Sequence, residues 1–85
     1  MREFSYTITK KENLHARPVG MLVRKAKTYA SNITISANGK ECSARGLMAV
    51  MALCVKCGTV VNVRVEGEDE ENCAQEMEAF FRENL

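Results

Sequence analysis

The β-strands that this sequence predicts share one property that restricts the fold more than any other feature: each has a polar face. Phe4, Tyr6 and Ile8, for example, alternate with serine and threonine residues. A period of two is typical of a strand with one buried and one hydrated face. The predicted strands span residues 4–9, 33–36, 40–43 and 61–66, and Asn38-Gly39 favours a tight hairpin between the second and third. One side of the sheet must therefore face water.

Three segments with helical spacing can cover the other side of the sheet. Their apolar residues are Val19, Leu22, Val23, Ala26 and Ala30 in the first, Leu47, Val50, Met51 and Cys54 in the second, and Cys73, Met77, Phe80 and Phe81 in the third. Pro18 suits a first helical turn, Gly58 can end the second helix, and Asp69 begins an acidic start to the third. The order β-α-β-β-α-β-α predicts a two-layer α+β sandwich, with a mixed or antiparallel sheet favoured over a parallel one.

Length and composition indicate one small domain, residues 1–85. The chain has 85 residues, of which 46% are hydrophobic and 27% charged, as in a globular protein. Its longest apolar stretch, 47–55, is far shorter than the roughly 20 residues of a membrane helix, and residues 1–9 contain no apolar signal core. We therefore expect a cytoplasmic protein without membrane insertion, whose cysteines are reduced.

The net charge of +1 hides an uneven distribution. Residues 1–65 contain 11 basic and 3 acidic residues, whereas residues 66–85 contain 1 basic and 8 acidic residues. This polarity favours a basic docking face for an acidic partner or ligand.

The only histidine, His15, lies between a predicted loop and the first helix, in the run Asn13-Leu14-His15-Ala16-Arg17-Pro18. A helix N-terminus offers unpaired N–H groups and partial positive charge, which favour a bound phosphoryl group and the uncharged imidazole. Uncharged imidazole is a nucleophile near neutral pH. Arg17 can offer a planar fork of donors to phosphoryl oxygens. A lone histidine is more often structural than reactive, so this motif needs support from its surroundings.

That support comes from a resemblance over nearly the whole chain. The chain resembles the histidine-containing phosphocarrier (HPr) family of the bacterial phosphoenolpyruvate-dependent sugar phosphotransferase system. The shared features are residues 14–18, the Asn38-Gly39-Lys40 hairpin, the run 47–51 and the acidic start of the last helix. The resemblance implies an open-faced β-sandwich, a four-stranded antiparallel sheet with three helices on one face. It also implies that enzyme I phosphorylates His15 on Nδ1 and that enzyme IIA domains receive the group, without a cofactor or metal.

A docking surface can be predicted beside the histidine. Helical spacing brings Arg17, Met21, Arg24 and Thr28 close to one face, with Lys27 beside them and Arg45 before the next helix. Leu47, Met48 and Met51 can supply an apolar centre. The family resemblance favours exposure of Leu47 and Met48, whereas core packing is an equal alternative for Met51. The predicted partner-binding residues are Arg17, Gly20, Met21, Arg24, Lys27, Arg45, Leu47, Met48 and Met51.

Several positions depart from the family. Many relatives carry a regulatory serine where this chain has Gly46, so we expect no regulatory phosphorylation there. Glu12 places a carboxylate where the family more often has a small polar residue, and this negative charge can alter the transfer rate. Cys54 and Cys57 form a C-x-x-C pair at the predicted end of the second helix, where we expect packing rather than metal or redox chemistry.

Two kinds of function remain open. The first is a monomeric phosphocarrier that is not itself an enzyme, either the general carrier of the transport system or a regulatory paralogue. The second is an HPr-like adaptor that binds proteins without phosphotransfer. Nucleic-acid binding is disfavoured, because the few aromatic residues form no stacking motif.

Overall fold

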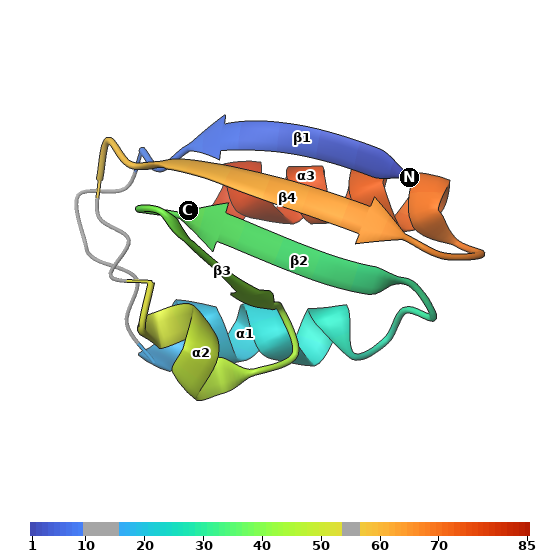
Figure 1. The fold of residues 1–85 in the computed structure, drawn as a ribbon, viewed down its shortest axis with the longest axis horizontal. Coiled ribbons are helices and arrows are strands. Elements are labelled where there is room, and N and C mark those ends of the chain that lie inside the picture. The colour runs from blue at the N-terminus through green and yellow to red at the C-terminus, as the bar shows by residue number, and fades with distance from the viewer. Residues whose placement is uncertain (10–15, 54–56) are drawn as a thin grey trace.

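The computed structural model describes residues 1–9, 16–53 and 57–85, with only the backbone for Ala16 and Arg17. Its elements are β1 (Arg2–Thr7), α1 (Ala16–Ala26), β2 (Asn32–Ala37), β3 (Lys40–Ser43), α2 (Leu47–Met51), β4 (Val60–Glu66) and α3 (Glu70–Asn84). The four strands form one sheet in the order β1-β4-β2-β3, and every neighbouring pair is antiparallel. The predicted element order, sheet and fold class are confirmed (Figure 1).

The predicted alternation explains the two layers. In β2, Ile33 and Ile35 are buried, whereas Thr34 and Ser36 on the opposite face are only half-buried. Helix α3 lies behind β1 and β4, and α1 and α2 lie along the β2 and β3 side (Figure 1). The buried side chains of sheet and helices form one core, so the polar sheet face stays open to solvent.

The predicted end of the first helix was wrong. Helix α1 ends at Ala26, and Ala30, predicted on its apolar stripe, is exposed in the connection to β2. The Thr28 N–H and hydroxyl both donate to the Lys25 carbonyl, at 3.0 and 2.7 Å, which tightens the last turn. The Ala30 N–H donates to Asp69 at 3.0 Å instead of continuing the helix. A side chain distant in sequence therefore stabilises the connection that follows α1.

The other boundary corrections concern the first strand and the second helix. Strand β1 ends at Thr7, although Ile8 remains buried and its N–H donates to the Thr59 carbonyl at 3.0 Å. Helix α2 ends at Met51, so the prediction that Gly58 ends it was wrong. Gly58 has a φ of 90° and its N–H donates to the Ile8 carbonyl at 2.8 Å, so it joins the segment before β4 to the residue that follows β1.

Two glycines in open space predict opposite effects of the same substitution. Gly20 lies within α1 and Gly39 lies in the β2–β3 hairpin with a φ of 77°, and a Cβ at either position would contact nothing within 4 Å. Gly20→Ala should raise the free energy of unfolding by about 0.5–1 kcal/mol, because alanine loses less entropy in a helix. Gly39→Ala should lower it by about 1–2 kcal/mol, because alanine disfavours positive φ. Urea denaturation measures both, and a shift of the same sign in the two variants would contradict this account.

Candidate functional site: the start of α1 and the α1–α2 surface

Helix α1 begins at Ala16, the residue that follows the only histidine. His15 lies outside the described residues, as do Glu12 and the side chain of Arg17. The first turn of α1 contains no acidic residue, and its last turn contains Arg24 and Lys25. The N–H groups of a first helical turn and the helix dipole favour an anion at this end. The backbone thus provides the electropositive helix start that the sequence predicted next to His15.

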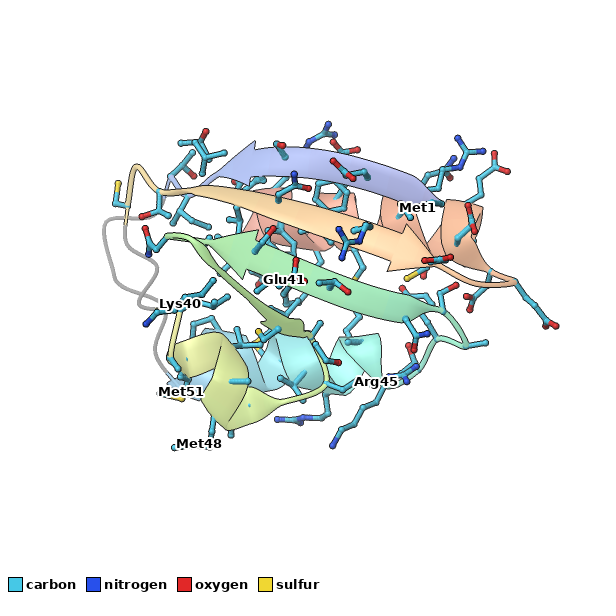
Figure 2. All side chains as sticks on the ribbon, in the orientation of Figure 1. Met1, Lys40, Glu41, Arg45, Met48 and Met51 are labelled. Carbon is cyan, nitrogen blue, oxygen red and sulfur yellow. The ribbon has the colours of Figure 1, made fainter. Side chains whose placement is uncertain are left out.

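The predicted apolar centre of the docking surface is at the molecular surface. Met48 is 77% exposed, Met21 is 41% exposed and Leu47 is 39% exposed. Met21 belongs to α1, and the other two belong to α2, which packs against α1. Met48 projects from α2 on the outside of the molecule (Figure 2). The prediction that Leu47 and Met48 are exposed is therefore confirmed.

The remaining predicted docking residues divide into three groups. Arg24 and Lys27 are exposed on and just after α1, and Gly20 is half-buried. Met51 is half-buried and packs against the core, so the core alternative describes much of its side chain. Arg45 is exposed, yet its guanidinium donates hydrogen bonds within the molecule. The pattern alone did not predict this last contact.

Asp69 holds the connection between α1 and β2. Its carboxylate accepts hydrogen bonds from the N–H groups of Ala30 at 3.0 Å and Ser31 at 2.9 Å, and from the Ser31 hydroxyl. These hydrogen bonds, led by that of the Ser31 hydroxyl, hold the pKa of Asp69 below its usual range. Nearby, Gly67 has a φ of 155°, and a Cβ there would lie 2.6 Å from the Ser31 Cα. The sequence identified Asp69 only as a residue at a helix start, because its partners lie 38 and 39 residues away.

The lowered pKa of Asp69 predicts a specific loss of stability in acid. Because the folded-state pKa lies below the unfolded value near 3.8, this group stabilises the fold above that pH, and the contribution disappears as pH falls through the folded pKa. Asp69→Asn should therefore lower the melting temperature at pH 7, and the difference from wild type should shrink below about pH 4. Thermal unfolding between pH 2 and 7 tests this.

Glu71→Gln is the matched control for that experiment. Glu71 is exposed and pairs with Arg2 at 3.4 Å, an arrangement that contributes little to stability. Its substitution should leave the melting temperature almost unchanged at pH 7. An equal loss in both variants would show that general charge, rather than the Asp69 hydrogen bonds, is responsible.

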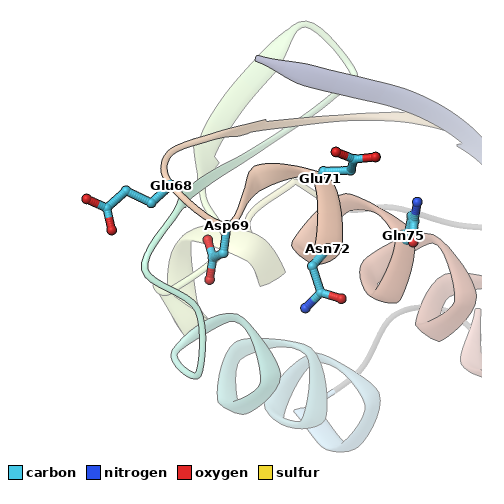
Figure 3. Close-up of a pocket in the computed structure, with 5 residues that line it drawn as sticks. All are labelled: Glu68, Asp69, Glu71, Asn72 and Gln75. Atoms are coloured by element: carbon cyan, nitrogen blue, oxygen red, sulfur yellow. The ribbon is translucent and has the colours of Figure 1, made fainter.

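A pocket at the start of α3 does not suit a phosphoryl group. It is lined by Glu68, Asp69, Glu71, Asn72 and Gln75 (Figure 3). Three carboxylates would repel phosphate oxygens. In residues 1–9, 16–53 and 57–85, no group of three or more histidine, cysteine, aspartate or glutamate side chains is arranged to hold a metal ion.

The structure does not confirm the packing that the sequence predicts for the C-x-x-C pair of Cys54 and Cys57. Cys54 lies outside the described residues, whereas Cys57 is exposed and lies beyond the end of α2, so its predicted burial and its place at a helix end were both wrong. Its Sγ donates to the Thr9 carbonyl at 3.7 Å. Cys73 is buried, and this burial raises its pKa to about 11. Burial also raises the pKa of Cys42, so neither Cys42 nor Cys73 is activated as a thiolate.

No helix among the described residues has the length and apolar character needed to cross a membrane.

The fold and the surface together define a small open-faced α+β sandwich. It presents the N-terminus of α1 and a surface with both basic and apolar side chains.

This chain is similar to several known phosphocarriers. Residues 2–83 match the family described as the PTS HPr component phosphorylation site. The phosphocarrier protein HPr of Xylella fastidiosa (strain Temecula1) is 41% identical over 81 residues, which cover 95% of this chain and 91% of that protein. A solved Mycoplasma histidine-containing phosphocarrier protein has a TM-score of 0.91 and 36% identity, and the match covers 96% of this chain and 93% of that one. The HPr-like protein Crh of Bacillus subtilis is 32% identical over 75 residues, 88% of each chain.

The chain belongs to the HPr family of phosphocarrier proteins of the phosphotransferase system. It is a phosphocarrier and not a stand-alone enzyme.

Proposed function

We propose that His15 accepts a phosphoryl group from phosphorylated enzyme I and passes it to enzyme IIA proteins, with Arg17 stabilising the phosphoryl oxygens. The observation that carries this proposal is the start of α1 at Ala16, directly after the only histidine of a chain in the HPr family. The helix start supplies partial positive charge where negative charge would arrive. A regulatory paralogue would use the same chemistry with other partners.

The transfer requires only an unprotonated ring nitrogen. In the first step this nitrogen attacks phosphorus, so a P–N bond to His15 forms while the bond between phosphorus and enzyme I breaks. In the second step a nucleophile of the recipient forms a bond to phosphorus, and the P–N bond breaks, which returns His15 to its starting state. Positioning and charge stabilisation supply most of the catalysis in such transfers. Neither step needs a cofactor or metal on this chain.

The α1–α2 surface is the proposed docking site for both partners. Its exposed apolar residues are Met21, Leu47 and Met48, and its exposed cations are Arg24 and Lys27, all on or next to the contacting helices α1 and α2. Flexible methionines suit a surface that binds different proteins in turn, and the cations suit acidic partners. We further propose that the protein acts in the cytoplasm as a monomer, because one surface must be free to alternate between donor and recipient.

Intact-mass measurement tests the proposed function. The chain is incubated with phosphoenolpyruvate, Mg²⁺ and enzyme I, and then held at acidic or alkaline pH before analysis. We expect the mass of one added phosphoryl group, lost in acid and retained in alkali. An unmodified chain in the presence of active enzyme I would contradict the proposal, and binding of enzyme I without modification would favour the adaptor alternative.

Gly46 predicts the absence of regulatory serine phosphorylation at the start of α2. Gly46 is the N-cap of α2 and has no hydroxyl to accept phosphate. An ATP-dependent HPr serine kinase should therefore leave the wild-type chain without phosphoserine. A Gly46→Ser variant, whose Cβ would lie 3.4 Å from the Ala49 Cβ in ordinary contact, provides the matched positive control. Phosphoserine in the wild-type chain, including at Ser43, would contradict this prediction.

A further inference from the structure

Arg45 belongs to a hydrogen-bond network inside the protein, although the sequence pattern predicts it as part of a basic docking rim. Its Nη2 donates to the Tyr29 carbonyl at 2.8 Å and to the Ser31 carbonyl at 3.1 Å. Both carbonyls belong to the connection between α1 and β2. Because one nitrogen bonds two backbone oxygens, the side chain is restricted to one orientation despite its exposure.

The connection that Arg45 contacts is held from the other side by α3 and its N-cap. Asp69 accepts the Ala30 and Ser31 N–H groups, and the Tyr29 hydroxyl donates to Glu76. The carbonyls that receive the Arg45 hydrogen bonds therefore have a defined position relative to the core. Arg45 therefore donates its hydrogen bonds to a segment, the connection after α1, whose position is set by its contacts with α3 and Asp69.

Helix α2 depends on tertiary contacts for its position. It has five residues, Leu47–Met51, and its N-cap Gly46 makes no side-chain hydrogen bond. So short a helix is marginal without tertiary contacts. Buried Val50 and Leu53 hold its later part. Its N-cap Gly46 directly follows Arg45, whose N–H donates to the Ser43 hydroxyl at 3.2 Å.

We propose that Arg45 is a positioning residue that sets the start of α2 relative to α1. It thereby sets the spacing between Met21 on α1 and the exposed Leu47 and Met48 on α2, which together form the apolar centre of the docking surface. In Figure 2, Arg45 lies on the side of the molecule that carries α1 and α2. The inference rests on the proposed function, because it assumes that this surface binds enzyme I.

If Arg45 is a positioning residue, the reach of its side chain should matter for binding and its positive charge should not. A lysine keeps the charge, but its side chain is shorter, so its ammonium does not reach the position from which Nη2 of Arg45 donates to both carbonyls. Arg45→Lys should therefore behave almost like Arg45→Met. Arg24 is the matched control, because it is an exposed cation of the same surface. Arg24→Lys should resemble wild type, and Arg24→Met should weaken binding in a salt-dependent way.

Two measurements on the four variants test the inference, and neither requires phosphoryl transfer. One is the dissociation constant for enzyme I at low and high salt. The other is hydrogen exchange at the Val50 and Ala52 amides, which donate within α2 to the Gly46 and Met48 carbonyls at 2.9 Å each. Both Arg45 variants should exchange faster at these amides and bind about fivefold to tenfold more weakly.

Two results would overturn the inference. If Arg45→Lys matched wild type in both measurements while Arg45→Met resembled Arg24→Met, Arg45 would be a docking charge. If exchange were faster but affinity unchanged, Arg45 would stabilise α2 without shaping the docking surface. A wild-type chain that binds enzyme I but accepts no phosphoryl group would contradict the proposed function alone.

Discussion

Replacing His15 with alanine should abolish acid-labile phosphorylation of this chain by enzyme I. The effect should be complete, because His15 is the only histidine and a methyl side chain offers no nitrogen to form the P–N bond. Intact mass after incubation with phosphoenolpyruvate, Mg²⁺ and enzyme I provides the measurement. The wild-type chain should gain one phosphoryl group, and the variant should gain none.

Arg17→Lys is the control for that experiment. Lysine keeps the positive charge but lacks the planar fork, so the variant should still carry the acid-labile group while accumulating it more slowly. Both variants should unfold at nearly the wild-type temperature, which would exclude loss of the fold as the cause. An acid-labile addition to His15→Ala at the wild-type rate would show that another residue is the acceptor.

Phe81→Ala should cause the largest loss of stability among single substitutions in the core. Phe81 is 1% exposed and packs edge-on against Phe4 and Tyr6, each with ring centroids 5.8 Å from its own. Removal of a buried phenyl ring leaves a cavity and lowers the free energy of unfolding by about 3–5 kcal/mol. A domain of this size has roughly 4–13 kcal/mol in total. Urea denaturation should therefore show a greatly reduced midpoint, or no folded baseline.

Phe80→Ala provides the comparison within the same helix. Phe80 is half-buried beside Phe81, with ring centroids 6.4 Å apart, so its removal should lower stability considerably less. Phe81→Leu keeps much of the apolar volume and should remain folded even if the alanine variant does not. Equal losses for Phe80→Ala and Phe81→Ala would contradict the burial argument.

Local patterns were sufficient to predict the elements of this fold. Alternation in 33–36 and 61–66 places Ile35 and Val63 in the core as predicted, because side chains alternate between the faces of any strand. Asn38 and Gly39 have φ values of 54° and 77°, as the predicted hairpin requires. These features depend on neighbours within a few residues, so they can be recognised in the sequence.

Boundaries were predicted less well where a distant residue competes for backbone groups. The apolar stripe continues to Ala30, but α1 ends at Ala26, where the Thr28 N–H donates to the Lys25 carbonyl, and Asp69 accepts the Ala30 and Ser31 N–H groups farther along the chain. The pairing of β1 with β4 joins Phe4 to Val63, and no local pattern specifies that partner. The family resemblance, rather than spacing, indicated that Leu47 and Met48 are exposed, as the structure shows. Neither signal predicted that the Arg45 guanidinium donates to the Tyr29 and Ser31 carbonyls.

The sequence by itself determined the type and order of the elements, the polar sheet face and the histidine directly before a helix, because each depends on periodicity or adjacency along the chain. Only the tertiary structure decided the strand order, the hydrogen bonds from Ala30 and Ser31 to Asp69, and those from Arg45 to the Tyr29 and Ser31 carbonyls. These depend on hydrogen bonds between residues that the chain brings together only after it folds.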